Sequence, residues 1–311
     1  METYVVTGGA GFIGSHLVRH LAELGEKVRV LDNFSTGSLE SLSGVSGDLE
    51  VIAGDVRDAE GVRACVRDAS CVIHLAAQIS VPLSVERPAE TDEINTRGTL
   101  NVLAAARDAG AKRFVLASSC AVYGDCPALP LREDCPPQPL SPYAVTKLAG
   151  EHYARVFHEL YGFPTVSLRY FNVFGPGQRP DSPYAAVIPR FAQAVAAGRP
   201  PTVYGDGEQT RDFVHVANVV EANMLACRSD RAVGRAINIG SGSETSLNQL
   251  LEALGRIVGR SVSATHEPAR PGDIRHSAGD ISLARELLGY DCKVGLDEGL
   301  KRTYEYFARS A

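Results

Sequence analysis

A tyrosine and a lysine four residues apart are the side chains of this sequence that point most directly to chemistry. Tyr143 and Lys147 stand in a stretch with helical periodicity, residues 141–160, so they share one face of the predicted helix. A phenol with the ordinary pKa of about 10 is a poor base at neutral pH, but a neighbouring ammonium favours its ionised form. The pair could therefore take a proton from a hydroxyl group.

A serine at the end of a predicted strand could complete this group. Ser119 follows the strand pattern of residues 113–117, where its hydroxyl can donate a hydrogen bond to an oxygen that is being oxidised. Tyrosine and lysine at this spacing are common by chance on protein surfaces. The prediction of Ser119, Tyr143 and Lys147 as catalytic residues therefore depends on evidence for a redox cofactor nearby.

A glycine-rich segment provides that evidence. Gly8, Gly11 and Gly14 follow the first predicted strand (residues 4–6) and open the first predicted helix (residues 12–24). Glycines in this place permit a tight turn and let backbone N–H groups and the helix N-terminus approach a pyrophosphate. The spacing is GxxGxxG rather than GxGxxG, and the physical requirement is the same. The segment predicts a dinucleotide site.

An acidic residue indicates which dinucleotide binds. Asp32 ends the second predicted strand, residues 27–31, where its carboxylate can accept hydrogen bonds from the adenosine ribose. No arginine or lysine occurs in residues 33–36, so the additional phosphate of NADP would meet Asp32 without a compensating cation. The sequence therefore predicts NAD, with Asp55 and Val56 at its adenine. The positive nicotinamide ring would add to the effect of Lys147 on Tyr143.

The elements that must position these residues alternate between strand and helix. Further strand patterns occur at residues 49–53, 71–75, 113–117 and 165–169, with helical patterns between them, notably at 90–109 and 141–160. This alternation predicts an α/β fold, a Rossmann-type doubly wound parallel sheet covered on both faces.

The chain changes character beyond about residue 171. Prolines and glycines become frequent there, and the helical patterns are short, at residues 186–197 and 216–227. We expect residues 1–170 to form the NAD-binding domain, which also receives a segment near 208–240. Residues 171–311 are expected to form a smaller C-terminal α/β lobe that binds the substrate.

Composition argues against several other functions. The net charge of −6 and the pI near 5.8 give no electrostatic reason to expect nucleic acid or an anionic membrane as a partner. No stretch approaches the roughly 20 apolar residues that cross a bilayer, and no cleavage signal opens the chain, so we expect a cytoplasmic protein. The 7 cysteines include no Cys-x-x-Cys pair. We expect them to be buried and unpaired, and we expect no metal site.

With these motifs in place, the chain resembles the extended short-chain dehydrogenases/reductases, and within them the UDP-glucose/UDP-N-acetylglucosamine 4-epimerases. The resemblance covers nearly the whole chain. It is carried by residues 7–14 (TGGAGFIG), 74–77 (HLAA), 95–99 (NTRGT), 118–124 (SSCAVYG), 141–143 (SPY), 169–176 (RYFNVFGP), 211–216 (RDFVHV) and 270–273 (RPGD).

The resemblance implies a hydride cycle. Tyr143, aided by Ser119, would take the proton from the sugar 4-hydroxyl as NAD takes hydride from C4, and Lys147 would also hold the nicotinamide ribose. The 4-keto sugar would then turn and receive the hydride on its other face. The implied NAD-binding residues are Gly8, Gly11, Phe12, Ile13, Gly14, Asp32, Asn33, Asp55, Val56, Ala76, Asn95, Tyr143, Lys147 and Tyr170.

The resemblance also implies a site for the UDP-sugar. Arg211 and Arg270 would bind the diphosphate, because the planar guanidinium fork matches phosphate oxygens. Asp273 would bind the UDP ribose. The remaining implied substrate residues are Ser119, Tyr143, Asn172 at the sugar or its phosphates, the backbone of Ala186 and Val187 at the uracil, and Ser277.

Two features favour a particular reaction and sugar. Family members that dehydrate or decarboxylate nucleotide sugars carry an acidic residue just after the catalytic serine or threonine, whereas this chain has Cys120 and Ala121. Without a proton-transfer group the second chemical step has no agent, which favours epimerisation. Ser277 aligns with the residue that faces the substituent on sugar C2, and its small size leaves room for an N-acetyl group. We expect UDP-GlcNAc/UDP-GalNAc and UDP-Glc/UDP-Gal as substrates.

Alternatives stay open at this point. Residues 178–181 resemble the UDP-glucuronate 4-epimerases, although those tend to carry threonine in the place of Asn172. A nucleotide-sugar dehydratase or decarboxylase is a second enzyme alternative, and an NAD-sensing regulator is the alternative without activity. The resemblance also implies a homodimer through the helices at 90–109 and 141–160.

Overall fold

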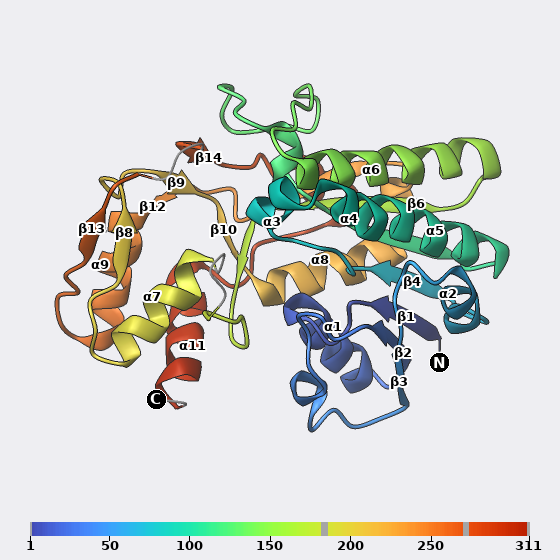
Figure 1. The fold of residues 1–311 in the computed structure, drawn as a ribbon, viewed down its shortest axis with the longest axis horizontal. Helices are drawn as coiled ribbons and strands as arrows, with labels where there is room; N and C mark the ends of the chain where they lie inside the picture. The colour runs from blue at the N-terminus through green and yellow to red at the C-terminus, as the bar shows by residue number, and fades with distance from the viewer. Residues whose placement is uncertain (1, 182–185, 270–273, 310–311) are drawn as a thin grey trace.

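A parallel sheet of seven strands forms the centre of the molecule (Figure 1). We describe the fold from a computed structural model, which defines residues 2–181, 186–269 and 274–309. The strand order is β11-β6-β5-β4-β1-β2-β3, and every pair is parallel. The strands are β1 (Thr3–Thr7), β2 (Lys27–Asp32), β3 (Leu49–Ala53), β4 (Cys71–His74), β5 (Arg113–Ser119), β6 (Thr165–Tyr170) and β11 (Ala236–Ile239).

This sheet confirms the predicted Rossmann-type fold. The chain runs from β1 outwards to β2 and β3, and then returns to continue on the other side of β1 with β4. Ligands of open parallel sheets bind beyond the carboxyl ends of the strands at such a switch point. Gly8 follows β1, Asp32 ends β2 and Ser119 ends β5. All three therefore lie at the carboxyl ends of the parallel strands, on the same side of the sheet.

Helices cover both faces of the sheet. Along β1, Tyr4 and Val6 pack into one core with α1 and α8, whereas Val5 packs into the other with α2 and α5. This alternation is the period of two expected of a strand buried on both sides. The helices are α1 (Phe12–Glu23), α2 (Ala59–Cys65), α3 (Val81–Glu86), α4 (Pro88–Asp92), α5 (Gly98–Asp108), α6 (Pro142–Tyr161), α8 (Val216–Arg228) and α10 (Ser282–Leu288).

The predicted helix at residues 90–109 is not one regular helix. A π-helical turn (Glu93–Arg97) separates α4 from α5. The wider turn carries Asn95 into the interior, where its side chain bonds with Gln78 and Thr146. Tertiary hydrogen bonding has here changed the local helical geometry.

Short strands and three helices form the carboxy-terminal region around a core of its own. In Figure 1 this region occupies the left side of the molecule. Its elements are β7 (Asn172–Phe174), α7 (Val187–Ala196), β8 (Thr202–Tyr204), β9 (Thr210–Arg211), β10 (Phe213–His215), β12 (Thr245–Ser246), α9 (Leu247–Val258), β13 (Thr265–Glu267), β14 (His276–Ser277) and α11 (Leu296–Ala308). The chain leaves this region for α8 and β11 and again for α10, which packs in the core of the sheet region, and the division into two domains stays a prediction.

The cysteines differ from expectation. Cys65 and Cys71 are buried, but the other five are only partly buried, so the prediction that all are buried is wrong. The sulfur atoms of Cys126 and Cys135 lie 2.6 Å apart as free thiols. Within the described residues, no helix is long and apolar enough to span a bilayer. The same residues include no cluster of three or more His, Cys, Asp or Glu side chains that could hold a metal ion.

Candidate active site

The loop after β1 is shaped by its glycines. Gly8 has a positive φ of 69°, and its N–H donates to the carbonyl oxygen of Leu31 at 2.8 Å. A β-carbon on Gly14 would collide with the carbonyl oxygen of Gly8 and lie 2.7 Å from the α-carbon of Gly9. Gly11, the N-cap of α1, provides no side-chain cap for the first helical N–H groups. The loop and helix N-terminus therefore suit an anionic pyrophosphate.

Asp32 fastens this loop to β2. One of its carboxylate oxygens accepts from the backbone N–H of Ala10 at 2.9 Å, and the other accepts from that of Phe34 at 2.8 Å. The side chain is buried, and each oxygen keeps a lone pair for a further donor. A ribose diol can supply such donors. The glycine cradle and this carboxylate together fit NAD.

The end of β3 carries a charge arrangement that the sequence did not reveal. Asp55 accepts hydrogen bonds from Asn33 at 2.9 Å and from Arg57 at 2.8 Å, and Arg57 holds the pKa of Asp55 well below its usual value. Arg57 is therefore a cation near Asp32 and Asn33, but its charge is matched by Asp55. Val56 is buried and leaves room only for glycine at Gly98, where a β-carbon would lie 2.6 Å away.

Other predicted NAD-binding residues lie on several elements of the sheet region. Ala76 follows β4 and abuts Gly8, whose added β-carbon would lie 2.8 Å from the backbone nitrogen of Ala76. Phe12 and Ile13 form the first turn of α1. The hydroxyl of Tyr170 donates to Asn223 at 2.9 Å. The side chain of Asn95 accepts from Gln78 and donates to Gln78 and Thr146, and its role at NAD stays a prediction.

Ser119, Tyr143 and Lys147 come together as predicted from their spacing. Ser141 caps the N-terminus of α6 by accepting from Ala144 at 3.2 Å, which places Tyr143 and Lys147 on successive turns. The lysine Nζ donates to the carbonyl oxygen of Ala117 on β5 at 2.8 Å and lies 5.8 Å from the centre of the tyrosine ring. Ser119 ends the same strand and hydrogen-bonds with Tyr143.

The environment of these groups corrects one expectation. Burial raises the pKa of Tyr143 to about 12, although the hydrogen bond with Ser119 opposes the shift. Burial lowers the pKa of Lys147 to about 8, and the charge of Glu151 opposes it. The protein groups alone therefore do not favour the tyrosinate, contrary to the effect expected of the ammonium. The positive nicotinamide ring of NAD is the charge that can do so.

A cavity of about 360 Å³ in the carboxy-terminal region brings four predicted substrate residues together. Its lining includes Asn172, Ala186, Val187 and Arg211. Ser277 is buried and lies opposite Arg211 in the pairing of β14 with β9. The two remaining predictions, Arg270 and Asp273, lie outside the described residues.

The same cavity is lined by residues that the sequence analysis missed. Arg190 on α7 lies 5.9 Å above the ring of Tyr204, and Gln209 donates to the carbonyl oxygen of Tyr204 at 2.7 Å. The side-chain oxygen of Gln209 is buried and accepts from none of the described residues. No periodic signal marks these positions, because β8 and β9 are too short to show one.

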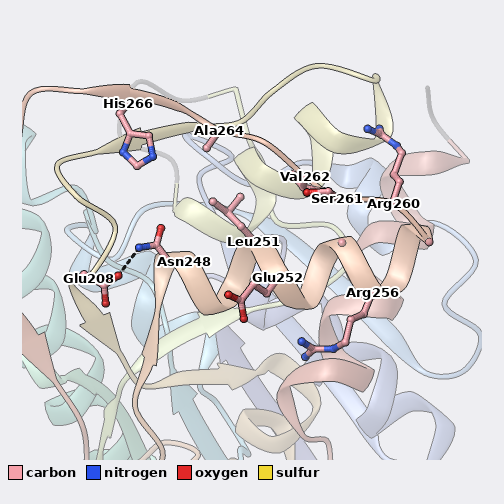
Figure 2. Close-up of a pocket in the computed structure, with 12 residues that line it drawn as sticks. Glu208, Asn248, Leu251, Glu252, Arg256, Arg260, Ser261, Val262, Ala264 and His266 are labelled. Atoms are coloured by element: carbon pink, nitrogen blue, oxygen red, sulfur yellow. Dashed lines mark hydrogen bonds between the residues drawn. The ribbon is translucent and has the colours of Figure 1, made fainter.

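A larger and more open cavity, about 830 Å³, runs along α9 towards β13. Figure 2 shows Glu208 and Asn248 hydrogen-bonded at one end of it and Arg256 and Arg260 towards the other. None of the predicted catalytic or substrate residues lines it. Four of the predicted substrate residues line the smaller cavity instead.

Comparison with known proteins agrees with this geometry. Residues 4–240 match the NAD dependent epimerase/dehydratase family. A UDP-glucose 4-epimerase of Mycolicibacterium smegmatis is 41% identical over 307 residues, which is 97% of each chain. A UDP-N-acetylglucosamine 4-epimerase of Methanobrevibacter ruminantium, solved with UDP-N-acetylmuramic acid, is 39% identical, with a TM-score of 0.95 over 100% of this chain and 99% of that one.

A third similar protein was solved with the cofactor. The UDP-glucose 4-epimerase of Thermus thermophilus, in complex with NAD, is 39% identical, with a TM-score of 0.89 over 99% of this chain and 100% of that one. The matched share of this chain, 99% or more in both solved structures, includes the sheet region and the carboxy-terminal region.

Proposed function

The chain belongs to the NAD dependent epimerase/dehydratase family, and on that premise we propose that it inverts the configuration at C4 of a UDP-hexose or UDP-N-acetylhexosamine. NAD is its cofactor and supplies the hydride acceptor and donor when bound. The observation that carries the proposal is the meeting of Ser119, Tyr143 and Lys147 at the sheet edge that also bears the glycine loop.

The side chains divide the work of proton transfer. Tyr143 as phenolate removes the proton of the 4-hydroxyl when C4 gives up its hydride, and Ser119 donates a hydrogen bond to the oxygen that becomes the carbonyl. Lys147, held by Ala117, keeps a positive charge beside the phenol. After the 4-keto sugar has turned and a hydride has returned to C4, Tyr143 gives the proton back to the oxygen. No net oxidation results.

The cavity residues hold the nucleotide. We propose that Arg211 and Arg270 bind the diphosphate, that Asp273 binds the ribose, and that Asn172 contacts the sugar or its phosphates. The backbone of Ala186 and Val187 would meet the uracil. Arg190, Tyr204 and Gln209 join this set, because they line the same cavity.

A tyrosine-to-phenylalanine substitution tests the reaction. Tyr143→Phe should lower kcat by about 10³-fold, because it removes the group that moves the proton. UDP binding, measured by calorimetry, should be unchanged. A kcat of the variant within tenfold of that of the unaltered protein would show that Tyr143 is not the base.

Product analysis tests the reaction type and the sugar. Purified protein should interconvert UDP-Glc with UDP-Gal and UDP-GlcNAc with UDP-GalNAc in an NMR time course. Release of CO₂ from UDP-glucuronate would indicate a decarboxylase, and a 4-keto-6-deoxy product would indicate a dehydratase. Epimerisation of UDP-glucuronate alone would move the assignment to the glucuronate branch.

The small side chain of Ser277 is proposed to admit the N-acetyl group. Ser277→Tyr should reduce kcat/KM for UDP-GlcNAc by at least about tenfold, since a bulky ring would occupy the space beside C2, while UDP-Glc is still converted. Equal losses on both sugars would contradict this role.

We also propose a homodimer through α4, α5 and α6. Val145, Leu160 and Tyr161 on α6 are apolar and more than half exposed, as is Val85 on α3. On α5, Leu103 is buried in the monomer core and is not part of this exposed surface. Sedimentation should show a dimer that Leu160→Glu weakens.

A further inference from the structure

A buried carboxylate lies directly behind the catalytic group. Glu151 stands on α6 one turn after Lys147, and its side chain is 6% exposed. It accepts two hydrogen bonds from Arg169 on β6, at 2.9 and 2.7 Å. It also accepts a short hydrogen bond from the hydroxyl of Ser118, the residue before Ser119 on β5. Glu151 thus joins the helix that carries the base to both strands beneath it.

The network continues from this ion pair to the loop that follows β5. Arg169 donates to the hydroxyl of Tyr123 at 2.9 Å, and Tyr123 donates to Asn238 on β11 at 2.7 Å. The backbone N–H of Asn238 donates to Glu133 at 2.8 Å. Tyr123 and Asn238 are fully buried. Each polar group along this path has a partner of fixed geometry.

Stability alone does not account for this arrangement. Burial of two opposite charges costs about as much as their attraction returns, and an apolar pair of similar volume often serves the fold as well. A charged pair in this place therefore calls for a role in its surroundings. The nearest functional groups are Lys147 on the same helix and Ser119 on the strand to which Glu151 is bonded.

We propose that Glu151, clamped by Arg169, is a positioning residue of the catalytic group. It fixes the placement of α6 on β5, so that Tyr143 and Lys147 meet Ser119, and its negative charge keeps the lysine ammonium protonated. The inference rests on the proposed function for its consequence in turnover. The effect on Lys147 holds whichever sugar the protein uses.

The charges around Lys147 agree with this role. Burial lowers the pKa of Lys147 to about 8, and Glu151 acts in the opposite direction. His74 on β4 is kept neutral because burial lowers its pKa to about 3. Arg169 on β6 stays charged, and burial keeps Cys120, in the turn after β5, protonated by raising its pKa to about 12. Glu151 is thus the negative charge that supports the ammonium.

The substitution Glu151→Gln keeps the shape of the side chain and removes its charge. The pKa of Lys147 should fall by roughly one unit, because loss of a nearby opposite charge disfavours the ionised form. NMR titration of isotope-labelled lysines, with Lys147→Met to assign the signal, reads this shift in the absence of sugar. The alkaline limb of the kcat profile should move to lower pH by the same amount, with KM little changed.

A second carboxylate, exposed to solvent but bonded to a buried arginine, provides a control for the loss of charge. Asp230 bonds Arg113 at 2.7 Å, and Arg113 is a buried arginine at the opposite end of β5. Asp230→Asn makes the same chemical change and should leave both the Lys147 titration and the pH profile unaltered. Glu151→Asp keeps the charge and should restore most of the Lys147 pKa, and it serves if the glutamine variant fails to fold.

The outcomes separate this proposal from the proposed function. An unchanged Lys147 pKa in Glu151→Gln overturns the role of Glu151 even if the protein is an epimerase. An equal shift in Asp230→Asn overturns it as well. If Tyr143→Phe remains active, the proposed function fails, while the titration still decides whether Glu151 sets the charge of Lys147.

Discussion

The sheet region and the carboxy-terminal region hold their functional residues by different means. In the sheet region, Gly8, Asp32 and Ser119 lie at the ends of strands of five to seven residues, and backbone geometry fixes them. In the carboxy-terminal region, the paired strands have only two or three residues, and hydrogen bonds of side chains such as Asp212 and Gln209 support them. The first kind of site depends on the space available to the backbone, and the second depends on individual polar groups.

Among the substitutions that test this difference, we expect the largest effect at Gly14 in the sheet region. Gly14→Ala should lower the affinity for NAD more than about 100-fold, and destabilise the protein by about 3 kcal/mol, because the new methyl group overlaps the backbone of Gly8. Calorimetry with NAD and urea unfolding measure the two effects. Gly11→Ala is the control: its methyl group would lie 3.2 Å from the same oxygen, so its losses should be much smaller.

In the carboxy-terminal region, we expect the largest effect at Asp212, whose carboxylate holds several segments together. It is fully buried, and its oxygens accept from the backbone and hydroxyl of Ser241, each at 2.7 Å, from Gly242 at 3.1 Å and from Gly279 at 3.3 Å. Asp212→Asn replaces an acceptor by a donor facing other donors. Stability in urea should fall by about 2–3 kcal/mol, and UDP affinity should fall with it. Unchanged UDP affinity would show that the cavity does not depend on this clamp.

This difference between the two regions also explains which site residues could be predicted from the sequence. Gly8, Asp32 and the Tyr143–Lys147 pair were predicted because long regular elements and a steric requirement leave a visible pattern. Gln209 was not, because its neighbourhood is built by pairing β9 with β14, far along the chain, through strands too short to show a period.

Two further features of the sheet region also escaped the sequence. The π-helical turn at Glu93–Arg97 depends on hydrogen bonds of Asn95 to residues distant in the chain. The raised pKa of Tyr143 depends on burial, which only the folded chain creates. Both features depend on tertiary contacts and not on the spacing of residues in the sequence. A sequence motif therefore indicates which residue is involved but not its charge state.

Two buried histidines, one in each region, should make the unfolding free energy of the protein depend on pH. Burial lowers the pKa of His74 to about 3, below the value near 6.5 of an exposed histidine. Its neutral form therefore stabilises the fold fully above about pH 6.5, and this contribution is lost as pH falls towards 3, by up to about 1.4 kcal/mol per unit. His74→Gln should flatten the dependence of unfolding free energy on pH between 4 and 6.5, measured by urea titration.

His215 is the counterpart in the carboxy-terminal region. Burial lowers its pKa to about 4, so its share of stability is lost over a narrower range as pH falls from about 6.5. His215→Gln should flatten the same curve by less than His74→Gln. A steeper or unchanged curve in both variants would contradict the assignment of these histidines as neutral groups.

The smallest effect is expected at the wall of the substrate cavity. Tyr204→Leu removes the ring beneath Arg190 and should weaken UDP binding by about 0.5–1 kcal/mol, roughly two- to fivefold. Calorimetric titration with UDP measures it, and NAD affinity should not change. A loss as large as that of Asp212→Asn would place Tyr204 in direct contact with the nucleotide.

The position of β11 has a consequence for synthesis. β6 ends at Tyr170, but the strand that pairs with its outer edge begins at Ala236, after α7 and β7–β10 have been made. A chain emerging from the ribosome therefore carries β6 as an open edge, and Tyr123 lacks its bond to Asn238 until that late segment arrives. A fragment that ends at Tyr170 would lack the outermost strand of this sheet, because β11 is encoded after the residues that line the smaller cavity.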